Sequence, residues 1–300
     1  MRGSKPTVLR QRRTPFVEIF RTTPAQTVCP NFYVLSHANG CSFRPLCRYC
    51  YLQASFWYLD RPHVFSNLDD MMAEIRHWID RDDPESVVLN AGNLSDSLSF
   101  EGVRPLAADL VALFRERAEK PGRPQTLLLV TKGGRRECRA FLESEPCASI
   151  VLSFSVNHPE AAARFEAGAA PPEERLAVAG ELLRGGWRVR LRIDPMIRGY
   201  DYIALAEQAR ELRPERVTLG TLRAEPSLFK FIPNGVLKDL VPSPDPRGLA
   251  RYPVEERVAL YRAVLTALGD VCSVGLCEET PEVWDAAGLD RTVALCNCAE

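Results

Sequence analysis

Short apolar runs alternate along this chain with amphipathic segments of helical length. Six runs have the length and composition of strands buried on both faces, at residues 31–36, 86–90, 126–131, 150–156, 187–193 and 217–221. Segments with helical periodicity lie between them, at residues 69–80, 104–119, 172–184 and 202–212. This regular alternation of strands and helices predicts an α/β fold with a parallel sheet.

Six strand-and-helix units are too few to close an eight-stranded barrel. The pattern therefore favours a partial (β/α)6 TIM-like barrel with a C-terminal extension, although a doubly wound sheet would show the same alternation. Six prolines interrupt the rhythm between residues 225 and 253, so we expect a long functional or mobile loop at 225–252. A helix at 254–268, a short strand at 272–276 and a cysteine-rich tail follow.

We accordingly predict a basic N-terminal arm at residues 1–29, a barrel at 30–224 and an extension at 225–300. The 38 Lys and Arg nearly balance the 39 Asp and Glu, which excludes an overall field that would draw the molecule to nucleic acid or an anionic membrane. The first residues lack the apolar core of a secretory signal, and no apolar run is long enough to span a membrane. We therefore expect a cytoplasmic protein whose ten cysteines are reduced.

Three cysteines follow the first predicted strand, in the sequence GCSFRPLCRYCYLQ. Cys41, Cys47 and Cys50 have the spacing Cys-x5-Cys-x2-Cys. Active sites of parallel barrels collect at the carboxyl ends of the strands, so three thiolates on this loop can converge on one soft metal centre. An iron–sulfur cube normally takes four cysteines, and three would leave one iron open. In the rival interpretation, His37 and the three cysteines close a zinc site.

Four cysteines near the end of the chain form a second group. Cys272, Cys277, Cys296 and Cys298 have the number required for an auxiliary iron–sulfur cluster or a structural zinc. A chain end folded over a barrel mouth could instead present Cys296 or Cys298 as a redox group or hydrogen donor. Cys277 can equally be a strand residue that points into the barrel, and plain structural cysteines are the remaining alternative.

Arg190, Arg192 and Asp194 alternate along the fifth predicted strand and therefore share one face. If that face lines a polar barrel interior, the arginines can bind an anionic substrate. If it faces the helices, the same residues form a buried ion-pair ladder. The pattern leaves both arrangements open.

Around the first cysteine group the sequence resembles the radical S-adenosylmethionine (SAM) superfamily and, within it, the spore photoproduct lyase family. Tyr49 and Tyr51 flank the third cysteine, as aromatic residues do in that superfamily. The resemblance runs from about residue 30 to 222 and again from 276 to 280. Its pieces are GC…CRYCYLQ at 40–53, GNLSDSLSF at 92–100, LLLVTK at 127–132, LSFSVN at 152–157, RFEAGAAPPEERLAVA at 164–179, RLRIDPMI at 190–197 and LGTLR at 219–223.

The resemblance implies a radical SAM partial barrel with a [4Fe–4S] cluster and SAM as cofactors. It makes Cys41, Cys47 and Cys50 the cluster ligands and leaves the fourth iron to the amino and carboxylate groups of SAM. The residues it implies around SAM are Tyr51, Gly92, Asn93, Lys132, Ser153, Ser155 and Arg192. A lysine at a strand end could instead extend to the surface.

Two departures from the family pattern change the expected chemistry. Five residues, 42–46, separate the first two cysteines where the family usually has three, so the surface beside the cluster must differ. The family also places a hydrogen-donating cysteine near the end of the second strand, and Leu94 stands there in this chain. Because an aliphatic side chain has no weak S–H bond, we expect hydrogen return to differ.

The implied activity is that of a radical SAM lyase. The reduced cluster would cleave SAM to a 5′-deoxyadenosyl radical, which abstracts hydrogen from a substrate, with Tyr51, Cys296 and Cys298 as expected catalytic residues. By resemblance, the reaction would cleave a C–C bond in a nucleic acid lesion. Phosphates would then meet Arg10, Arg12, Arg13, Arg135, Arg136 and Arg139.

Two alternatives to a lesion-repair enzyme remain at this point. One is a radical SAM enzyme that acts on a nucleoside or small metabolite. The other, from a different class, is a zinc-binding, non-catalytic nucleic-acid-binding protein. For the enzyme, the electron would come from a reductase such as flavodoxin or ferredoxin.

Overall fold

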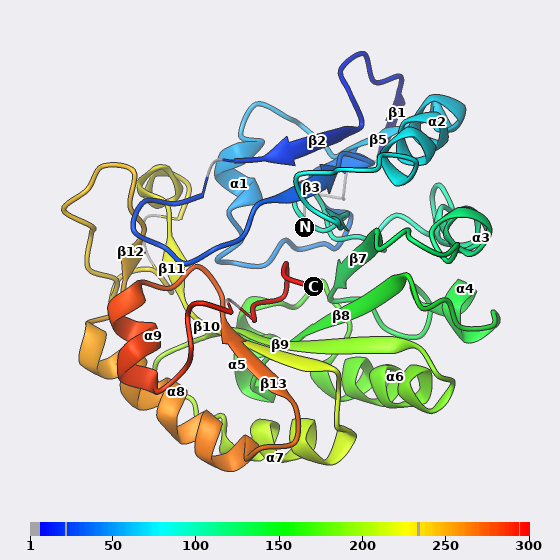
Figure 1. Cartoon of the computed structure of the whole chain (residues 1–300). Helices are drawn as coiled ribbons and strands as arrows, with labels where there is room; N and C mark the ends of the chain where they lie inside the picture. The colour runs from blue at the N-terminus through cyan, green and yellow to red at the C-terminus, as the bar shows by residue number, and fades with distance from the viewer. Residues whose placement is uncertain (1–6, 22, 233–234, 294) are drawn as a thin grey trace.

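A computed structural model describes residues 7–21, 23–232, 235–293 and 295–300. One sheet contains eight strands in the order β13-β10-β9-β8-β7-β6-β3-β2 (Figure 1). The six predicted strands are all present: β3 (Phe32–Leu35), β6 (Val88–Asn90), β7 (Thr126–Thr131), β8 (Ile150–Val156), β9 (Arg188–Met196) and β10 (Arg216–Thr221). They pair in parallel, as does β13 (Ser273–Leu276) with β10, whereas β2 (Val17–Phe20) is antiparallel to β3.

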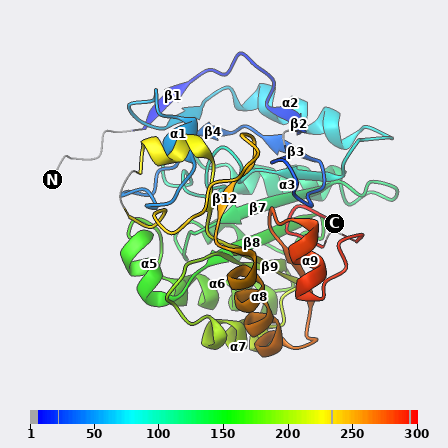
Figure 2. The ribbon, with the colours of Figure 1, turned by 90° about the vertical axis from the view of Figure 1, so that its left-hand side faces the viewer.

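The strand order decides between a barrel and a doubly wound sheet. From β3 to β10 the strands follow one another in space as they do in sequence, whereas a doubly wound sheet reverses direction at a switch point. Within the described residues no pairing joins β13 to β2, so the curved sheet stays open (Figures 1 and 2). The fold is the partial TIM-like barrel that the six-unit pattern predicts.

The long helices cover the outer face of this sheet (Figure 1). They are α2 (Leu68–Ile79), α3 (Ala107–Arg117), α6 (Pro172–Arg184), α7 (Ile203–Leu212) and α8 (Val254–Leu268). In α2, for example, Met71, Ile75 and Trp78 recur at helical spacing and are buried in the core between helices and sheet. None of the helices in the described part of the chain has both the length and the apolar character needed to cross a membrane.

Short elements surround the barrel and lie below the length at which periodicity is informative. The helices α1 (Leu52–Ser55), α4 (Arg139–Leu142), α5 (Pro159–Phe165) and α9 (Pro281–Ala287) have four to seven residues. A small second sheet contains β1 (Val8–Arg10), β5 (His63–Phe65) and β4 (Ala38–Asn39). The predicted arm thus supplies β1 and β2, and the extension supplies β13 to the main sheet. The division into arm, barrel and extension stays a prediction, and residues 1–6 of the arm lie outside the described part.

The expected long loop at residues 225–252 is wrong in its described part, because this segment has its own elements and packs. It contains the 3-10 helix η1 (Pro226–Lys230), and β12 (Ala250–Arg251) pairs with β11 (Arg223–Ala224). Leu228, Leu237 and Leu240 are buried in a second apolar core with residues of α5. The prolines start turns and one helical turn, and the leucines between them provide the burial.

Candidate active site

The cysteines of the Cys-x5-Cys-x2-Cys sequence lie on one loop between β4 and α1, beyond the carboxyl end of β3. Gly40 begins the loop with a φ of +87°, a backbone conformation that suits a residue without a Cβ. The Cys50 N–H donates to the Cys47 carbonyl at 3.1 Å, and the Gln53 side-chain amide donates to the same carbonyl at 2.9 Å. The last two cysteines are therefore held in one hydrogen-bonded turn.

The additional residues between the first two cysteines form a bulge that packs against the end of α5. The Arg44 guanidinium donates to the Cys41 carbonyl at 2.7 Å. A Cβ added to Gly168 would lie 2.2 Å from the Pro45 carbonyl oxygen, so this contact requires glycine. The Arg48 N–H donates at 2.8 Å to the last carbonyl of α5. Arg44 and Arg48 are both exposed. The bulge thus fixes the loop and leaves two cations on its surface.

Burial raises the pKa of all three thiols, to about 12 for Cys41. Cys50 adds to the rise for Cys41 and for Cys47, so the three side chains are electrostatic neighbours. In the described residues no group of three His, Cys, Asp or Glu side chains is placed to hold one metal ion. Three soft thiols suit an iron–sulfur cluster, whose ligands bind separate irons.

The alternative zinc site is not formed. His37 is buried, and its Nδ1 lies 3.3 Å from a guanidinium nitrogen of Arg104. Burial and the Arg104 charge lower the pKa of His37 to about 3, so the ring is neutral and enclosed in the protein. His37 is therefore a packed core histidine beside the loop.

Lys132, at the end of β7, points inward and not to the surface. Its ammonium lies 3.6 Å from Oε1 of Glu166, which also accepts a hydrogen bond from the Tyr49 hydroxyl. Arg175 donates to the other carboxylate oxygen at 2.7 Å. Although burial opposes it, Lys132 and Arg175 lower the pKa of Glu166 to about 2. An ionised carboxylate, absent from the sequence-based site, therefore positions Lys132 beside the cysteine loop.

Asp96 holds the segment after β6 against the end of β7. Its carboxylate accepts hydrogen bonds from the Lys132 N–H at 2.6 Å and from the Thr131 hydroxyl at 2.8 Å. The Leu98 N–H donates to it at 3.0 Å. Neither Asp96 nor Glu166 was expected in the site from the sequence, although both lie within the pieces GNLSDSLSF and RFEAGAAPPEERLAVA that carry the resemblance.

Tyr51 and Asn93 meet across the barrel mouth, because the Tyr51 hydroxyl donates to the Asn93 carbonyl. The family resemblance predicts that both residues lie around SAM, and the structure brings them together. Gly92 has a different explanation: a Cβ there would lie 2.6 Å from the Cβ of Val130 on β7. Close packing of the segment after β6 against β7 accounts for this glycine without a ligand.

On the opposite wall, two arginines surround Cys277. Arg192 and Arg223 donate to its Sγ at 3.3 and 3.1 Å. Both also pair with Asp194, and Arg223 pairs with Glu278 at 2.5 Å. Burial raises the pKa of Cys277, so it stays a thiol at neutral pH. The Nε of Arg192 is buried and has no hydrogen-bond partner among the described residues.

The end of the chain runs through the barrel interior (Figure 1). Arg190 donates to the carbonyls of Asn297 and Ala299, each at 2.7 Å. Arg216 donates to the carbonyls of Cys296 and Ala299, each at 2.8 Å. The fifth strand therefore does present its arginines to the interior. The expectation that Arg190 binds an anionic substrate is wrong, because the tail occupies its guanidinium.

The tail also covers one residue predicted to contact SAM. The Ser153 hydroxyl donates to Oδ1 of Asn297 at 2.8 Å, and Ser153 is fully buried. A role for Ser153 in SAM binding is therefore wrong in this structure. Ser155 lies two residues nearer the mouth, in register with Arg192, and stays a candidate.

Cys298 and Leu94 pack against the same apolar cluster inside the barrel, which includes Val34 and Val130. The Asn90 side-chain amide lies 3.7 Å from Sγ of Cys298. Cys296 is only 4% exposed, and burial raises its pKa, while backbone N–H groups of the tail next to the sulfur partly oppose the rise. The two tail thiols thus differ: Cys298 packs on the interior cluster that Leu94 also contacts, whereas Cys296 is turned into the tail.

The four C-terminal cysteines do not form a second metal site. Cys272 precedes β13 and Cys277 follows it, so the four-residue strand separates them by roughly 16 Å at about 3.3 Å per residue. One metal centre cannot bridge that separation. The prediction of an auxiliary cluster or zinc at Cys272, Cys277, Cys296 and Cys298 is therefore wrong.

Gly275 is expected to control how the tail is seated. A Cβ there would lie 1.9 Å from the Leu295 carbonyl oxygen, so Gly275→Ala should push the tail out of the barrel. Cys296 would then react with a thiol reagent about tenfold faster, equivalent to about 1.4 kcal/mol of local opening free energy. Gly102→Ala is the matched control, because no atom lies near its Cβ position. Equal thiol reactivity in wild type and Gly275→Ala would show that the tail is not held there.

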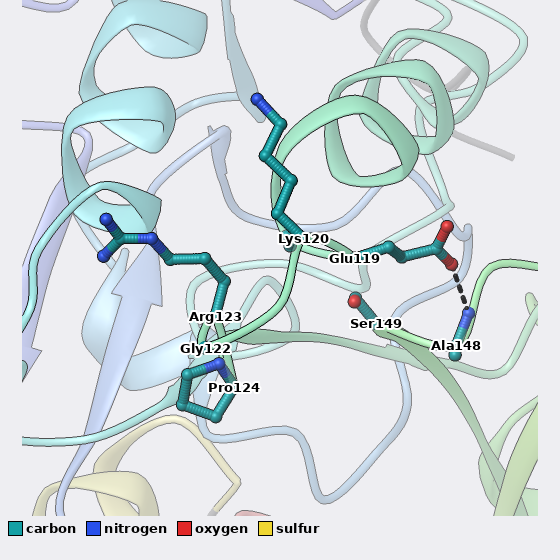
Figure 3. A pocket seen from close by; sticks show the side chains of 8 residues that line it. Glu119, Lys120, Gly122, Arg123, Pro124, Ala148 and Ser149 are labelled. Atoms are coloured by element: carbon teal, nitrogen blue, oxygen red, sulfur yellow. Dashed lines mark hydrogen bonds between the residues drawn. The ribbon is translucent and has the colours of Figure 1, made fainter.

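A surface hollow of about 620 Å³ lies at the amino ends of the strands (Figure 3). It is lined by the turn between α3 and β7 and by the residues before β8. Glu119 accepts a hydrogen bond from the Ala148 N–H at 2.7 Å, and Lys120 and Arg123 extend from the rim. Because the cysteine loop is at the carboxyl ends of the strands, this hollow takes no part in the candidate site.

Comparison with known proteins identifies the family. A sequence model described as "Spore photoproduct lyase" matches residues 9–217, more than half of the chain. The chain belongs to the spore photoproduct lyase family. The spore photoproduct lyase of Geobacillus sp. (strain Y412MC61) is 28% identical over 205 residues, covering 66% of this chain and 57% of that protein. That of Clostridium acetobutylicum is 23% identical over 186 residues, covering 62% and 53%. This chain thus spans little more than half the length of these relatives.

Solved structures of spore photoproduct lyase share the fold. One, complexed with dinucleoside spore photoproduct, has a TM-score of 0.72 at 19% identity and covers 90% of this chain and 82% of that chain. A mutant with bound AdoMet and dinucleoside spore photoproduct has a TM-score of 0.68 at 19% identity, with 89% and 81% covered. The partial barrel predicted from the strand pattern is therefore confirmed as the family fold.

Proposed function

We propose that this member of the spore photoproduct lyase family is a radical SAM lyase that acts on a nucleic acid lesion. The observation that carries the proposal is a loop of three neighbouring thiols at the mouth of this barrel. When bound, the cluster and SAM would supply a one-electron reductive cleavage that generates the 5′-deoxyadenosyl radical.

The test is anaerobic reconstitution with iron and sulfide, followed by SAM and dithionite with and without the dinucleoside spore photoproduct. We expect 5′-deoxyadenosine to form and the lesion to be cleaved. Formation of 5′-deoxyadenosine with an untouched lesion would favour the alternative substrates, a nucleoside or small metabolite. A colourless protein that binds zinc would support the non-catalytic rival.

Several residues of the chain are proposed to position SAM. Cys41, Cys47 and Cys50 would hold the cluster and leave one iron open. The Lys132 ammonium, fixed by Glu166 and adjacent to the loop, supplies positive charge for the SAM carboxylate. The remaining polar groups at the mouth are Tyr51, Asn93, Ser155 and the unpartnered Nε of Arg192.

Lys132→Ala is expected to weaken SAM binding by roughly 1 to 3 kcal/mol, the range for a charge-assisted hydrogen bond. Glu166 keeps its bond to Arg175 in this variant, so the fold and the cluster iron should be retained. Equilibrium binding of SAM to the reconstituted protein measures the effect, with Lys120→Ala as a control on the far hollow. Unchanged SAM affinity would remove Lys132 from the site.

Cys298 is proposed to return the hydrogen atom that Leu94 cannot supply. Both side chains pack on one apolar cluster, so the Cys298 thiol reaches the region of the missing cysteine from the tail. Burial raises the pKa of Cys298, which keeps the sulfur protonated and able to donate a hydrogen atom. The S–H bond would break homolytically as a C–H bond forms on the product, leaving a sulfur radical on Cys298.

Phosphate contacts are proposed for Arg10 and Arg13, which are exposed at the edge of the small sheet. Arg12 is held by Glu18 and lies over the Phe65 ring at 5.1 Å, so its role is structural. The other predicted arginines are already paired with carboxylates: Arg135 with Glu181, Arg136 with Glu137 and Arg139 with Glu143.

The cytoplasmic location and the reductase stay predictions.

A further inference from the structure

Exposed aromatic side chains gather beside the cysteine loop. Tyr51, Trp57 and Tyr58 are 41%, 68% and 59% exposed and lie within eight positions at and just after α1. The Trp57 and Tyr58 rings contact edge to face, with centroids 6.0 Å apart. Single exposed apolar residues are ordinary, but a contiguous aromatic group on a protein surface marks a contact site.

The segment that carries these rings is positively charged. Between residues 41 and 63 the charged side chains are Arg44, Arg48 and Arg61 against Asp60. Arg44 and Arg48 are exposed on the cysteine loop itself. Burial and then the charges of Arg10 and Arg61 lower the pKa of His63, so both guanidinium groups lie near this residue. We call Arg44, Arg48, Trp57, Tyr58 and Arg61 the loop-side surface.

The proposed function requires one electron for each SAM cleaved. The electron must therefore enter from outside, next to Cys41, Cys47 and Cys50. The loop-side surface begins on that loop and continues just beyond α1.

Resting on the proposed function, we propose that the loop-side surface docks a small acidic one-electron carrier protein, either flavin-containing or iron–sulfur. The carrier loses one electron and the cluster gains it, and no bond is made or broken. Exposed Trp, Tyr and Arg are the residues that dominate protein interfaces. Redox complexes use small contact areas, and opposite charge raises their association rate.

The geometry favours a protein over a nucleic acid at this position. The planes of Trp57 and Tyr58 are inclined by 85°, so the two rings do not form the parallel platform on which successive bases stack. Phosphate binding is better accounted for by Arg10, at the end of β1, and by Arg13 three residues later. The loop-side surface also adjoins the site that the electron must reach.

The experiment compares a protein reductant with a small one. Trp57→Ala/Tyr58→Ala and Arg48→Glu are made, with exposed Arg210→Glu on α7 as the charge control. Affinity for flavodoxin, and separately for a [2Fe–2S] ferredoxin, is measured on the reconstituted protein at low and high salt. We expect both loop-side variants to lose about tenfold or more in carrier affinity and in carrier-driven cluster reduction. Both loop-side variants should match wild type in dithionite-driven 5′-deoxyadenosine formation. Arg210→Glu should match wild type in carrier affinity and in carrier-driven cluster reduction.

Two results would overturn the docking proposal. One is carrier affinity that is absent in wild type or unchanged in both variants. The other is that both loop-side variants lose binding to single-stranded DNA but keep their carrier affinity. This result would assign the surface to nucleic acid. A wild type that forms no 5′-deoxyadenosine with dithionite would overturn the proposed function instead, and the carrier affinities would still decide the docking.

Discussion

Replacing Cys41, Cys47 and Cys50 by alanine is expected to abolish SAM cleavage under dithionite. The three thiols are the cysteine ligands that this loop offers to an iron–sulfur cluster, so their removal leaves the loop without one. Neither brown colour nor iron should remain after reconstitution. Iron content and 5′-deoxyadenosine, measured by chromatography, give the readout.

Cys272→Ala is the matched control, because this partly buried cysteine lies at the amino end of β13, away from the loop. It should retain iron and activity. Circular dichroism of the triple variant should match wild type, since the loop is also held by Gly40 and by the contact with Gly168. If the folded triple variant still forms 5′-deoxyadenosine, the ligand assignment is wrong.

Cys298→Ala is expected to leave hydrogen abstraction intact and to remove hydrogen return. The product radical would then persist and be trapped by dithionite or diverted into side products, and clean repair would fall by about a hundredfold or more. The dinucleoside spore photoproduct is the substrate, and products are separated by mass. In heavy water a thiol carries deuterium, so wild type should deliver deuterium to the product and Cys298→Ala should not.

Leu94→Cys in the Cys298→Ala background tests whether a thiol at residue 94 can replace the Cys298 thiol, because both side chains pack against one apolar cluster. A thiol at residue 94 should restore clean repair. Cys296→Ala alone should behave as wild type, since Cys296 is turned into the tail. Clean stoichiometric repair by Cys296→Ala/Cys298→Ala would exclude the tail as hydrogen donor. Without a strand cysteine, we expect wild type to repair this lesion less efficiently than its relatives.

The barrel was predictable from local sequence where strands are buried on both faces. Residues 126–131 and 150–156 are near-continuous apolar runs and form β7 and β8 with those bounds. The helix at 172–184 likewise matches α6. The four-residue β2 lacks such a signal, because its place depends on antiparallel pairing with β3. Packing in the proline-rich segment was missed because prolines were interpreted only as breaks.

The candidate site was predictable where its residues are adjacent in sequence. Cysteine spacing identified the loop, and the resemblance identified Lys132 at a strand end. The partners of Lys132 were missed because Glu166 reaches it from the end of α5, which is a matter of tertiary packing. The path of the tail was missed for the same reason. It depends on the missing Cβ of Gly275 and on interior arginines whose carbonyl partners no local pattern indicates.

Electron paramagnetic resonance of the reconstituted, dithionite-reduced wild type, recorded with and without SAM, tests the central claim most directly. Three cysteine ligands leave one iron open, so we predict about four irons per chain and a reduced-cluster signal that changes when SAM is added. The signal should be absent from the folded triple cysteine variant. One bound zinc with no signal, or a cluster signal that SAM leaves unchanged, would contradict the assignment of this barrel mouth as a radical SAM site.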